Sequence, residues 1–534
     1  MELEILGMSM SLTMALVTII LAFIVFYLTK DYWCHTYWKR RGVVFEPGSP
    51  ILGTFIPFKK GLATGYDILQ KKHGKVYGMY TFQEPILVVG DPDMLRHIFV
   101  KNFSQFHDRP RFLNMNEDML HGLGALEGKR WHEVRNVVSP TFSAAKMKQM
   151  APLVNKSADH LVEHFGKMQK KKGFVECKEL FGSFAIDTIG SCAFGLDIDA
   201  QSDPNNPFVS NAKRGFLFDF GMLFLLSNIC HPIGRILTKT GLCTFFPVDV
   251  IEFFRNVTLK AVELRKNISS GNMTKRVDFL QLLLDAHKDA ERETEEDEDD
   301  LTAFDHHDNR HSPTNTPPKN VQLTDRELCA QAVTFFIAGY ETTTTLLGFI
   351  FYALARNSHV QEKLIEEVDK MAPSRDTVGY SSVAHMPYMD KVVCETLRMF
   401  PPAAIGNRLC TESFEYNGIM VEKGVQVMFP LKAIHHNPEY WPEPEKFDPE
   451  RFNKSEREKR HPYSYLPFGS GPRNCVGMRF ALMETKMAVC RLLQKFRFET
   501  CAQTEIPTVF GGGGTLTPPN GVTLKAIPRT NSVA

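Results

Sequence analysis

The sequence predicts a mainly helical fold, and three segments supply the helices on which this prediction rests. An uncharged apolar stretch runs from Ile5 to Leu28. A second, longer run begins after Thr324 and continues to about Asn357. From Arg479 onward, apolar residues recur with the spacing of an amphipathic helix. Helices therefore dominate the parts of the chain whose pattern is clearest.

The first apolar stretch is long enough to span roughly 30 Å of hydrocarbon. Glu2 and Glu4 precede it, whereas several cations follow it, namely Lys30, Lys39, Arg40 and Arg41. Because positive charge is retained on the cytosolic side, we expect a single-pass anchor over residues 1–30, with its short N-terminus in the lumen. A cleaved signal peptide is the alternative, but such peptides begin with positive charge and have shorter apolar runs.

The rest of the chain is expected to form one linker and one large domain. Residues 31–50 contain the stiff turn Pro47-Gly48-Ser49-Pro50, which indicates a proline-rich hinge, and residues 51–534 follow as one domain. Within it, residues 289–319 change character, with the acidic run ERETEEDEDD followed by the polar, proline-rich HHDNRHSPTNTPPK. Such composition cannot bury a core, so we expect a disordered insertion there.

Composition excludes some function classes. The net charge is +1 and no basic tract with interleaved aromatic residues occurs, which argues against a nucleic-acid partner. The 11 cysteines form no C-x-x-C pair, so they indicate a reducing compartment rather than a disulfide framework. No nucleotide-binding glycine loop is present, so any electrons must come from another protein.

The long central run has an unusual middle. Thr324 and Glu327 form a capping box, and the predicted helix of roughly 32 residues is about 48 Å long. Gly339, Glu341 and Thr342 then interrupt an otherwise apolar sequence. Glycine weakens a helix, and threonine can bend one by bonding back to a carbonyl. The residues favour a locally opened helix; the alternative is a buried helix whose threonines only satisfy carbonyl groups.

The most informative motif is the run Phe468 to Gly477, which contains Cys475. Gly469 and Gly471 permit a tight turn and close approach. The helix that follows places Cys475 at a helix N-terminus, where free N–H groups and the dipole favour a thiolate. A buried thiolate is a proximal ligand for haem iron. The alternative is an inert buried cysteine.

A pair of charges lies upstream of this motif. Glu395 and Arg398 are three residues apart, hence neighbours on one helix face, and Pro401 ends that helix. Such a pair alone says little, because exposed ion pairs are common. The segment Pro449-Glu450-Arg451-Phe452 follows it in order and adds a second arginine.

These motifs, taken in order, resemble the cytochrome P450 superfamily from about residue 47 to about residue 525. The loop matches F-x-x-G-x-R-x-C-x-G at every defined position, beginning with Phe468. The likeness is to the microsomal clan that includes the drug-oxidising family 3 enzymes and thromboxane synthase. It implies a mainly α fold with small β-sheets (α+β), in which haem lies between the long helix and the Cys475 loop.

The resemblance also implies roles for single residues. Cys475 would be the thiolate ligand of haem b, and Gly339, Glu341 and Thr342 would form the oxygen-activation segment, with Thr342 as the alcohol and Glu341 as the acid. Haem-propionate contacts would come from Arg109, Trp131, Arg135, Arg408 and Arg473, and Phe468 and Gly339 would also belong to the haem-binding site. Glu395, Arg398 and Arg451 would form a buried structural charge cluster, which would be costly unless well hydrogen-bonded.

The implied activity is that of a membrane-bound monooxygenase in the endoplasmic reticulum, with its catalytic domain in the cytosol. It would insert one atom of O2 into an apolar small molecule, with electrons from NADPH through NADPH–cytochrome reductase and with cytochrome b5 as a candidate second partner. The apolar stretch from Gly215 to Leu226 would roof the substrate cavity and touch membrane lipid; a plain core helix is the alternative.

Two other functions stay open at this point. A thromboxane-synthase-like isomerase would rearrange a lipid endoperoxide without electrons, and the insertion at 289–319 favours it because those enzymes carry a comparable one. Thr342 favours the monooxygenase, because the isomerase needs no proton relay and the mammalian thromboxane synthases lack this threonine. A non-catalytic haem carrier or sensor fits poorly, because its oxygen-activating groups would be idle.

Overall fold

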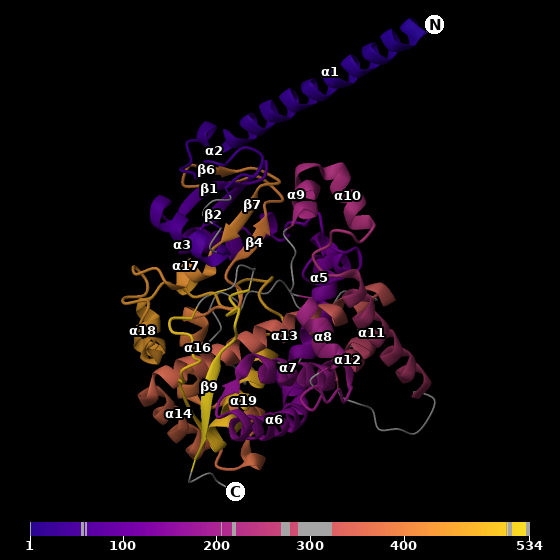
Figure 1. Ribbon diagram of the computed structural model, residues 1–534. Coiled ribbons are helices and arrows are strands. Elements are labelled where there is room, and N and C mark those ends of the chain that lie inside the picture. Colours follow the sequence, from indigo (N-terminus) through magenta and orange to yellow (C-terminus); the bar gives the residue numbers. More distant parts are fainter. Residues whose placement is uncertain are drawn as a thin grey trace.

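The computed structural model describes residues 2–54, 58, 61–203, 205–215, 221–268, 278–286, 323–508, 510 and 515–529, without the side chains of 2–12, 266–268 and 285–286. The predicted insertion at 289–319 lies outside the described residues. Figure 1 shows a body of two parts, a smaller one with a β-sheet and a larger helical one, from which a single helix projects. The mainly α fold with small sheets is confirmed.

The projecting helix is α1 (Glu2–His35). Its stretch Thr13–His35 is long and apolar enough to cross a membrane, and none of its most apolar window is buried. Asp325–Arg356 passes the same test of length and composition, but 72% of its window is buried inside the body. Only the first of these two helices is therefore available as an anchor.

Helix α1 does not end at the predicted anchor boundary of residue 30. It continues to His35, and α2 (Tyr37–Arg40) follows directly. Asp31 is buried and accepts a hydrogen bond from the Ile51 N–H group at 3.1 Å. Trp38 is completely buried, and its indole N–H donates to the carbonyl of Met79 at 3.1 Å. The start of the segment predicted as a linker thus packs against the body, and the division at residues 30 and 50 stays a prediction.

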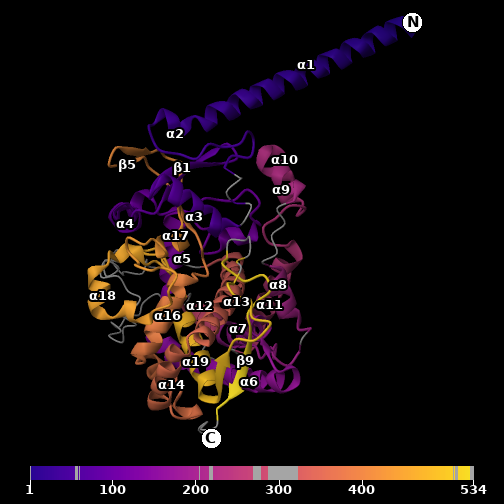
Figure 2. The ribbon, with the colours of Figure 1, turned by 60° about the vertical axis from the view of Figure 1, so that its left-hand side comes forward.

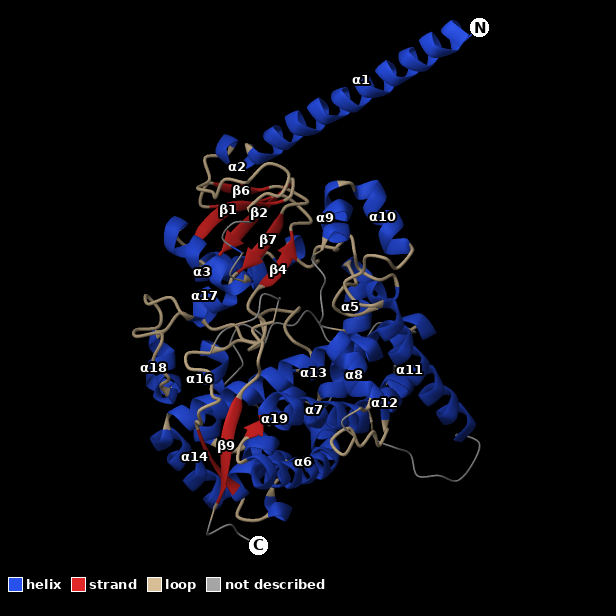
Figure 3. Ribbon diagram, viewed as in Figure 1, coloured by secondary structure: helices blue, strands red, loops and turns tan. Residues whose placement is uncertain are grey.

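The smaller part of the body surrounds a four-stranded sheet of order β1-β2-β7-β4, shown in red in Figure 3. Strands β1 and β2 are an antiparallel hairpin, β2 runs parallel to β7, and β4 is antiparallel to β7. The strands are β1 (Val76–Thr81), β2 (Glu84–Val89), β3 (Val175–Glu176), β4 (Gly406–Leu409), β5 (Phe414–Tyr416), β6 (Ile419–Val421), β7 (Gln426–Phe429), β8 (Phe496–Glu499) and β9 (Thr523–Pro528). A second sheet, β3-β9-β8, lies in the helical part.

The helical part is built around α13, which packs against α7, α11, α16 and α19. Figure 2 shows α13 between these helices from a second direction. The further α-helices are α3 (Leu62–His73), α4 (Pro92–Arg96), α5 (Gly128–Val138), α6 (Ala144–Lys172), α7 (Cys177–Phe194), α8 (Pro207–Arg214), α9 (Met222–Ile229), α10 (His231–Lys239), α11 (Val248–Ile268), α12 (Phe279–Ala286), α13 (Asp325–Arg356), α14 (Ser358–Met371), α15 (Tyr380–Ala384), α16 (Pro387–Met399), α17 (Leu431–His435), α18 (Lys454–Lys459) and α19 (Met478–Lys495).

The long helix forms where the sequence predicts it. Thr324 is its N-cap, both bonds of the capping box with Glu327 are present, and the helix has 32 residues. Its side chains are almost all buried from Leu328 onward, so it forms the centre of the largest hydrophobic cluster. The helix continues without a break across Gly339. The predicted local opening is therefore not seen in the backbone of this helix.

Candidate active site

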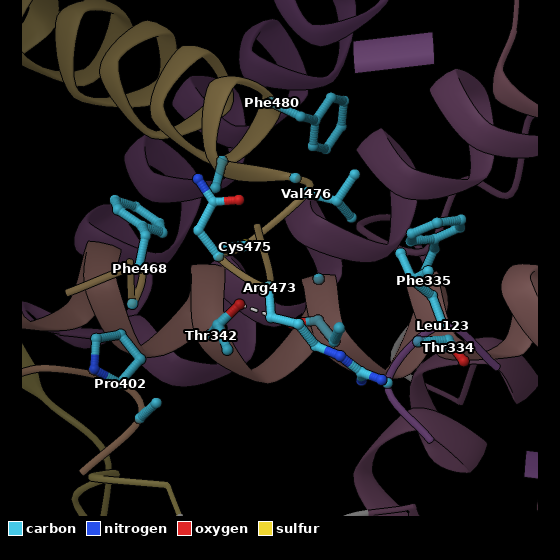
Figure 4. A pocket seen from close by; sticks show the side chains of 18 of the residues that line it. Leu123, Thr334, Phe335, Thr342, Pro402, Phe468, Arg473, Cys475, Val476 and Phe480 are labelled. Atoms are coloured by element: carbon cyan, nitrogen blue, oxygen red, sulfur yellow. Dashed lines mark hydrogen bonds between the residues drawn. The ribbon is translucent and has the colours of Figure 1, made fainter. Parts of the chain in front are cut away.

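A cavity of about 540 Å³ lies between α13, α5, β4 and the loop before α19. Its wall is largely apolar, with Leu123, Phe142, Phe279, Phe335 and Leu346 among the lining residues. Figure 4 shows Thr342 on α13 and Cys475 on the loop lining this same cavity. A cavity of this size and character is typical of a site for a small molecule or cofactor.

Two glycines shape the loop that carries Cys475. Gly469 and Gly471 have φ angles of 73° and 72°, in the left-handed region that favours glycine. A Cβ atom on Gly471 would lie 2.0 Å from the carbonyl oxygen of Phe99, so no side chain fits there. The Cys475 N–H group donates to the Phe468 carbonyl at 2.9 Å, and α19 begins three residues later at Met478. The predicted turn before a helix is confirmed.

The Cys475 sulfur is accessible from the cavity, although protein surrounds it on the other sides. Burial raises the pKa of its thiol above the ordinary value; the Gly477 N–H group, Arg135 and Arg109 oppose this rise without cancelling it. The N–H group near the helix end thus lowers the pKa of the thiol, in the direction that the sequence predicts, but desolvation is the larger effect. A thiol that coordinates a metal ion is deprotonated outright, so ligation does not depend on the helix end.

The start of the loop is held by a buried histidine. His435, at the end of α17, accepts a hydrogen bond at Nε2 from the Leu466 N–H group at 2.8 Å. Its carbonyl oxygen accepts one from Arg398 at 3.0 Å. An N–H donor facing Nε2 requires a lone pair there, which is the neutral imidazole. His435 thus connects the charge pair on α16 to the Cys475 loop.

This histidine makes stability depend on pH. Burial, the largest cause, lowers the pKa of His435 from its ordinary 6.5 to about 3. Between these values the unfolded chain binds a proton that the folded chain does not, so stability falls as the pH falls below 6.5. Lowering the pH from about 7.5 to about 5 is expected to cost about 2 kcal/mol through this group. Urea-unfolding midpoints at the two pH values measure the loss.

In the His435→Gln variant, whose amide oxygen can accept from Leu466, the loss between the two pH values should be smaller by about 2 kcal/mol. The same substitution at His359, which is exposed, should leave the pH dependence as in the unsubstituted protein. An identical loss in both variants would contradict the assignment to His435.

Four arginines converge on the cavity wall, namely Arg109, Arg135, Arg408 and Arg473. Burial lowers the pKa of each, to about 10 for Arg135 and about 9 for Arg473. Within the described part of the chain, Nε of Arg408 and both Nε and Nη1 of Arg473 have no hydrogen-bond partner. Buried cations with unused donors fit an anionic ligand, and guanidinium groups suit carboxylates in particular. The site therefore fits the haem propionates.

The predicted pair on α5 also reaches the site. Trp131 lines the cavity. The Arg473 guanidinium carbon lies over the Trp131 ring, 4.3 Å from the ring centroid. Arg135 donates to the carbonyl of Asn474 at 3.0 Å and to its amide oxygen at 2.8 Å. Asn474 is a residue that sequence reasoning missed as a positioning contact, although its place beside Cys475 could have suggested it.

The two residues of the predicted acid–alcohol pair face different surroundings. Thr342 lines the cavity, as does Gly339, and the Thr342 hydroxyl donates to the Ala338 carbonyl at 2.6 Å. Glu341 is buried but is not among the described cavity-lining residues; its Oε1 accepts from Thr517 at 2.7 Å. Thr342 thus bonds back to a carbonyl, as expected for a buried helix whose threonines satisfy carbonyl groups. It nevertheless faces the cavity.

The predicted charge cluster forms behind the loop. Arg398 donates to both carboxylate oxygens of Glu395, at 2.7 and 2.9 Å, and both side chains are completely buried. The Asp448 N–H group donates to Glu395 at 2.9 Å, and Arg451 lies 3.5 Å from the same oxygen. The structure brings all three predicted residues together, at one end of the His435 connection to the loop.

Comparison with known proteins decides the family. The family model "Cytochrome P450" matches residues 45–526. The chain belongs to the cytochrome P450 family. It is 36% identical over 514 residues to Cytochrome P450 3A56 of Fundulus heteroclitus, covering 96% of this chain and 98% of that relative. It is 37% identical over 501 residues to Cytochrome P450 3A7 of Homo sapiens, covering 94% of each.

Membership confirms the predicted resemblance, including the likeness to family 3. A P450 carries haem whose iron is held by a cysteine thiolate, so the predicted cofactor is confirmed. The enzyme class follows as well: this P450 is a haem-thiolate monooxygenase.

Proposed function

We propose that this P450 is anchored in the endoplasmic reticulum membrane by α1 and oxidises apolar small molecules with electrons from NADPH. The electrons would arrive through NADPH–cytochrome reductase, with cytochrome b5 as a second donor. The observation that carries the proposal is the cavity itself, because the Thr342 hydroxyl and the Cys475 sulfur line one largely apolar chamber.

Each residue at the cavity has a separate task in this proposal. Haem held by a cysteine thiolate would supply the chemistry that activates O2. Cys475 would hold it from the loop side, and the four arginines would bind its propionates. Thr342 lies at the helix wall. Its proton now points to the Ala338 carbonyl, and rotation about the Cβ–Oγ1 bond turns that proton toward the cavity, where Thr342 could pass it to a ligand.

Exposed apolar side chains support contact with lipid beyond α1. Met222 and Leu223 on α9 are 70% and 46% exposed, and Ile236 on α10 is 64% exposed. Figures 1 and 2 show α9 and α10 at the end of the molecule from which α1 projects. Residues 216–220 of the predicted roof lie outside the described residues, but the exposure of α9 argues against a plain core helix. We propose that α9 and α10 rest on the cytosolic leaflet.

Reconstitution with a microsomal reductase tests the proposal. Apolar substrates and a prostaglandin endoperoxide are each supplied with and without NADPH. Strict NADPH dependence on an apolar substrate supports the monooxygenase proposal. Rapid turnover of the endoperoxide without NADPH would instead establish the isomerase and overturn it.

Replacing Thr342 with Ala is expected to uncouple NADPH consumption from product formation, because the hydroxyl that this residue presents to the cavity is lost. A positioned proton donor contributes about 10²–10⁴-fold in rate, so product per NADPH should fall at least severalfold while NADPH consumption continues. Product and hydrogen peroxide are measured together with NADPH. Thr342→Ser should retain coupling; unchanged coupling in Thr342→Ala would contradict the relay.

A further inference from the structure

The acid of the pair is turned away from the cavity. Glu341 and Thr342 are consecutive on α13, so their side chains leave the helix roughly 100° apart. Thr342 lines the cavity, whereas the Glu341 carboxylate meets the Thr517 hydroxyl at 2.7 Å. Glu341 is only 6% exposed, so this hydrogen bond to a buried acid contributes to where the carboxylate sits.

Thr517 is itself held firmly in place. It belongs to the C-terminal segment 515–518, where Leu516 is buried and its N–H group donates to the Pro402 carbonyl at 3.0 Å. Thr515 forms an isolated β-bridge with Ala403. Pro402 and Ala403 both line the cavity. The segment therefore contacts the cavity wall through Thr515 and Leu516. It contacts α13 through Thr517.

The hydrogen bonds around Thr517 run in one direction. Its hydroxyl has one proton, which it donates to Glu341 Oε1. Thr345 lies 3.0 Å from the same hydroxyl and one turn along α13 from Glu341. Because the Thr517 proton is already used, Thr345 is the donor in that second bond. Thr345, Thr517 and Glu341 thus form a short ordered chain that ends at the carboxylate.

We propose that Thr517 is a positioning residue for Glu341. Its hydroxyl holds the buried carboxylate on the side of α13 that faces the segment 515–518, whereas Thr342 faces the cavity. This inference rests on the proposed function, in which Thr342 passes a proton to the ligand, and it takes Glu341 as the acid that returns a proton to Thr342. The alternative is that Thr517 has a structural role only, in which its hydrogen bond holds the C-terminal segment against α13.

Thr517→Val removes the hydroxyl and keeps the shape. Product formed per NADPH should fall about fivefold, the factor that corresponds to one net hydrogen bond, and the solvent deuterium isotope effect on product formation should change. Thr517→Ser restores the donor and should restore both values. Thr504→Val is the matched control, because Thr504 bonds to the Thr523 carbonyl at 2.6 Å in the same C-terminal region; it should leave coupling unchanged.

A second readout does not depend on turnover. The unfolding free energies of Thr517→Val, Glu341→Gln and the double variant form a double-mutant cycle. The destabilisations caused by these two substitutions should be non-additive, because the two side chains interact. The destabilisations caused by Thr504→Val and Glu341→Gln should be additive. This inference alone would be overturned if Thr517→Val kept wild-type coupling and an unchanged isotope effect while Thr342→Ala was uncoupled. Normal coupling in Thr342→Ala would overturn the relay and this inference with it.

Discussion

Replacing Cys475 with Ala is expected to abolish the carbonyl spectrum of thiolate-ligated haem and to reduce monooxygenase turnover to background. Alanine offers no iron ligand in place of the Cys475 sulfur. The absorbance spectrum of the reduced protein under carbon monoxide measures the first effect. Circular dichroism should show a folded chain, because Cys475 faces the cavity rather than the core.

Cys192 provides the matched control. It lies on α7 and lines the same cavity, so Cys192→Ala removes a cavity sulfur without touching the loop. The carbonyl spectrum should stay that of a thiolate-ligated haem. A normal spectrum in Cys475→Ala, or its loss in Cys192→Ala alone, would contradict the assignment of the ligand.

Replacing Glu395 with Ala is expected to destabilise the protein by about 3–5 kcal/mol, because Arg398 is left as a buried charge without its partner. Burial raises the pKa of Glu395, and Arg398 opposes that rise through its hydrogen bonds and charge. Arg398 also holds the His435 carbonyl, so the Cys475 loop should loosen and haem retention should fall. Urea unfolding and the haem-to-protein absorbance ratio measure the two effects.

Glu362→Ala is the control for this prediction. Glu362 pairs with Arg497 in an exposed ion pair, with 56% and 46% of the two side chains accessible. Such a pair contributes about 0–1 kcal/mol. Equal losses of stability from Glu395→Ala and Glu362→Ala would contradict the prediction that breaking the buried ion pair on α16 costs more than breaking an exposed one.

The parts of the site that could be predicted are those encoded by neighbouring residues. The capping box at Thr324, the helix that begins just after Cys475 and the shared helix face of Glu395 and Arg398 all depend on spacings of a few residues. Short-range spacing specifies backbone geometry directly, because capping, turn formation and helix faces are local properties. The order of these motifs along the chain was also sufficient to indicate the family.

The sequence by itself therefore determined the class of fold, the long helix, the cysteine loop and the cofactor that a P450 carries. Only the tertiary structure decided that Glu341 faces Thr517, that Arg135 binds Asn474 and that His435 holds Leu466. The first two contacts join residues 176 and 339 positions apart. No local spacing encodes such contacts, because they depend on how separate elements pack and on which polar groups burial leaves in need of a partner.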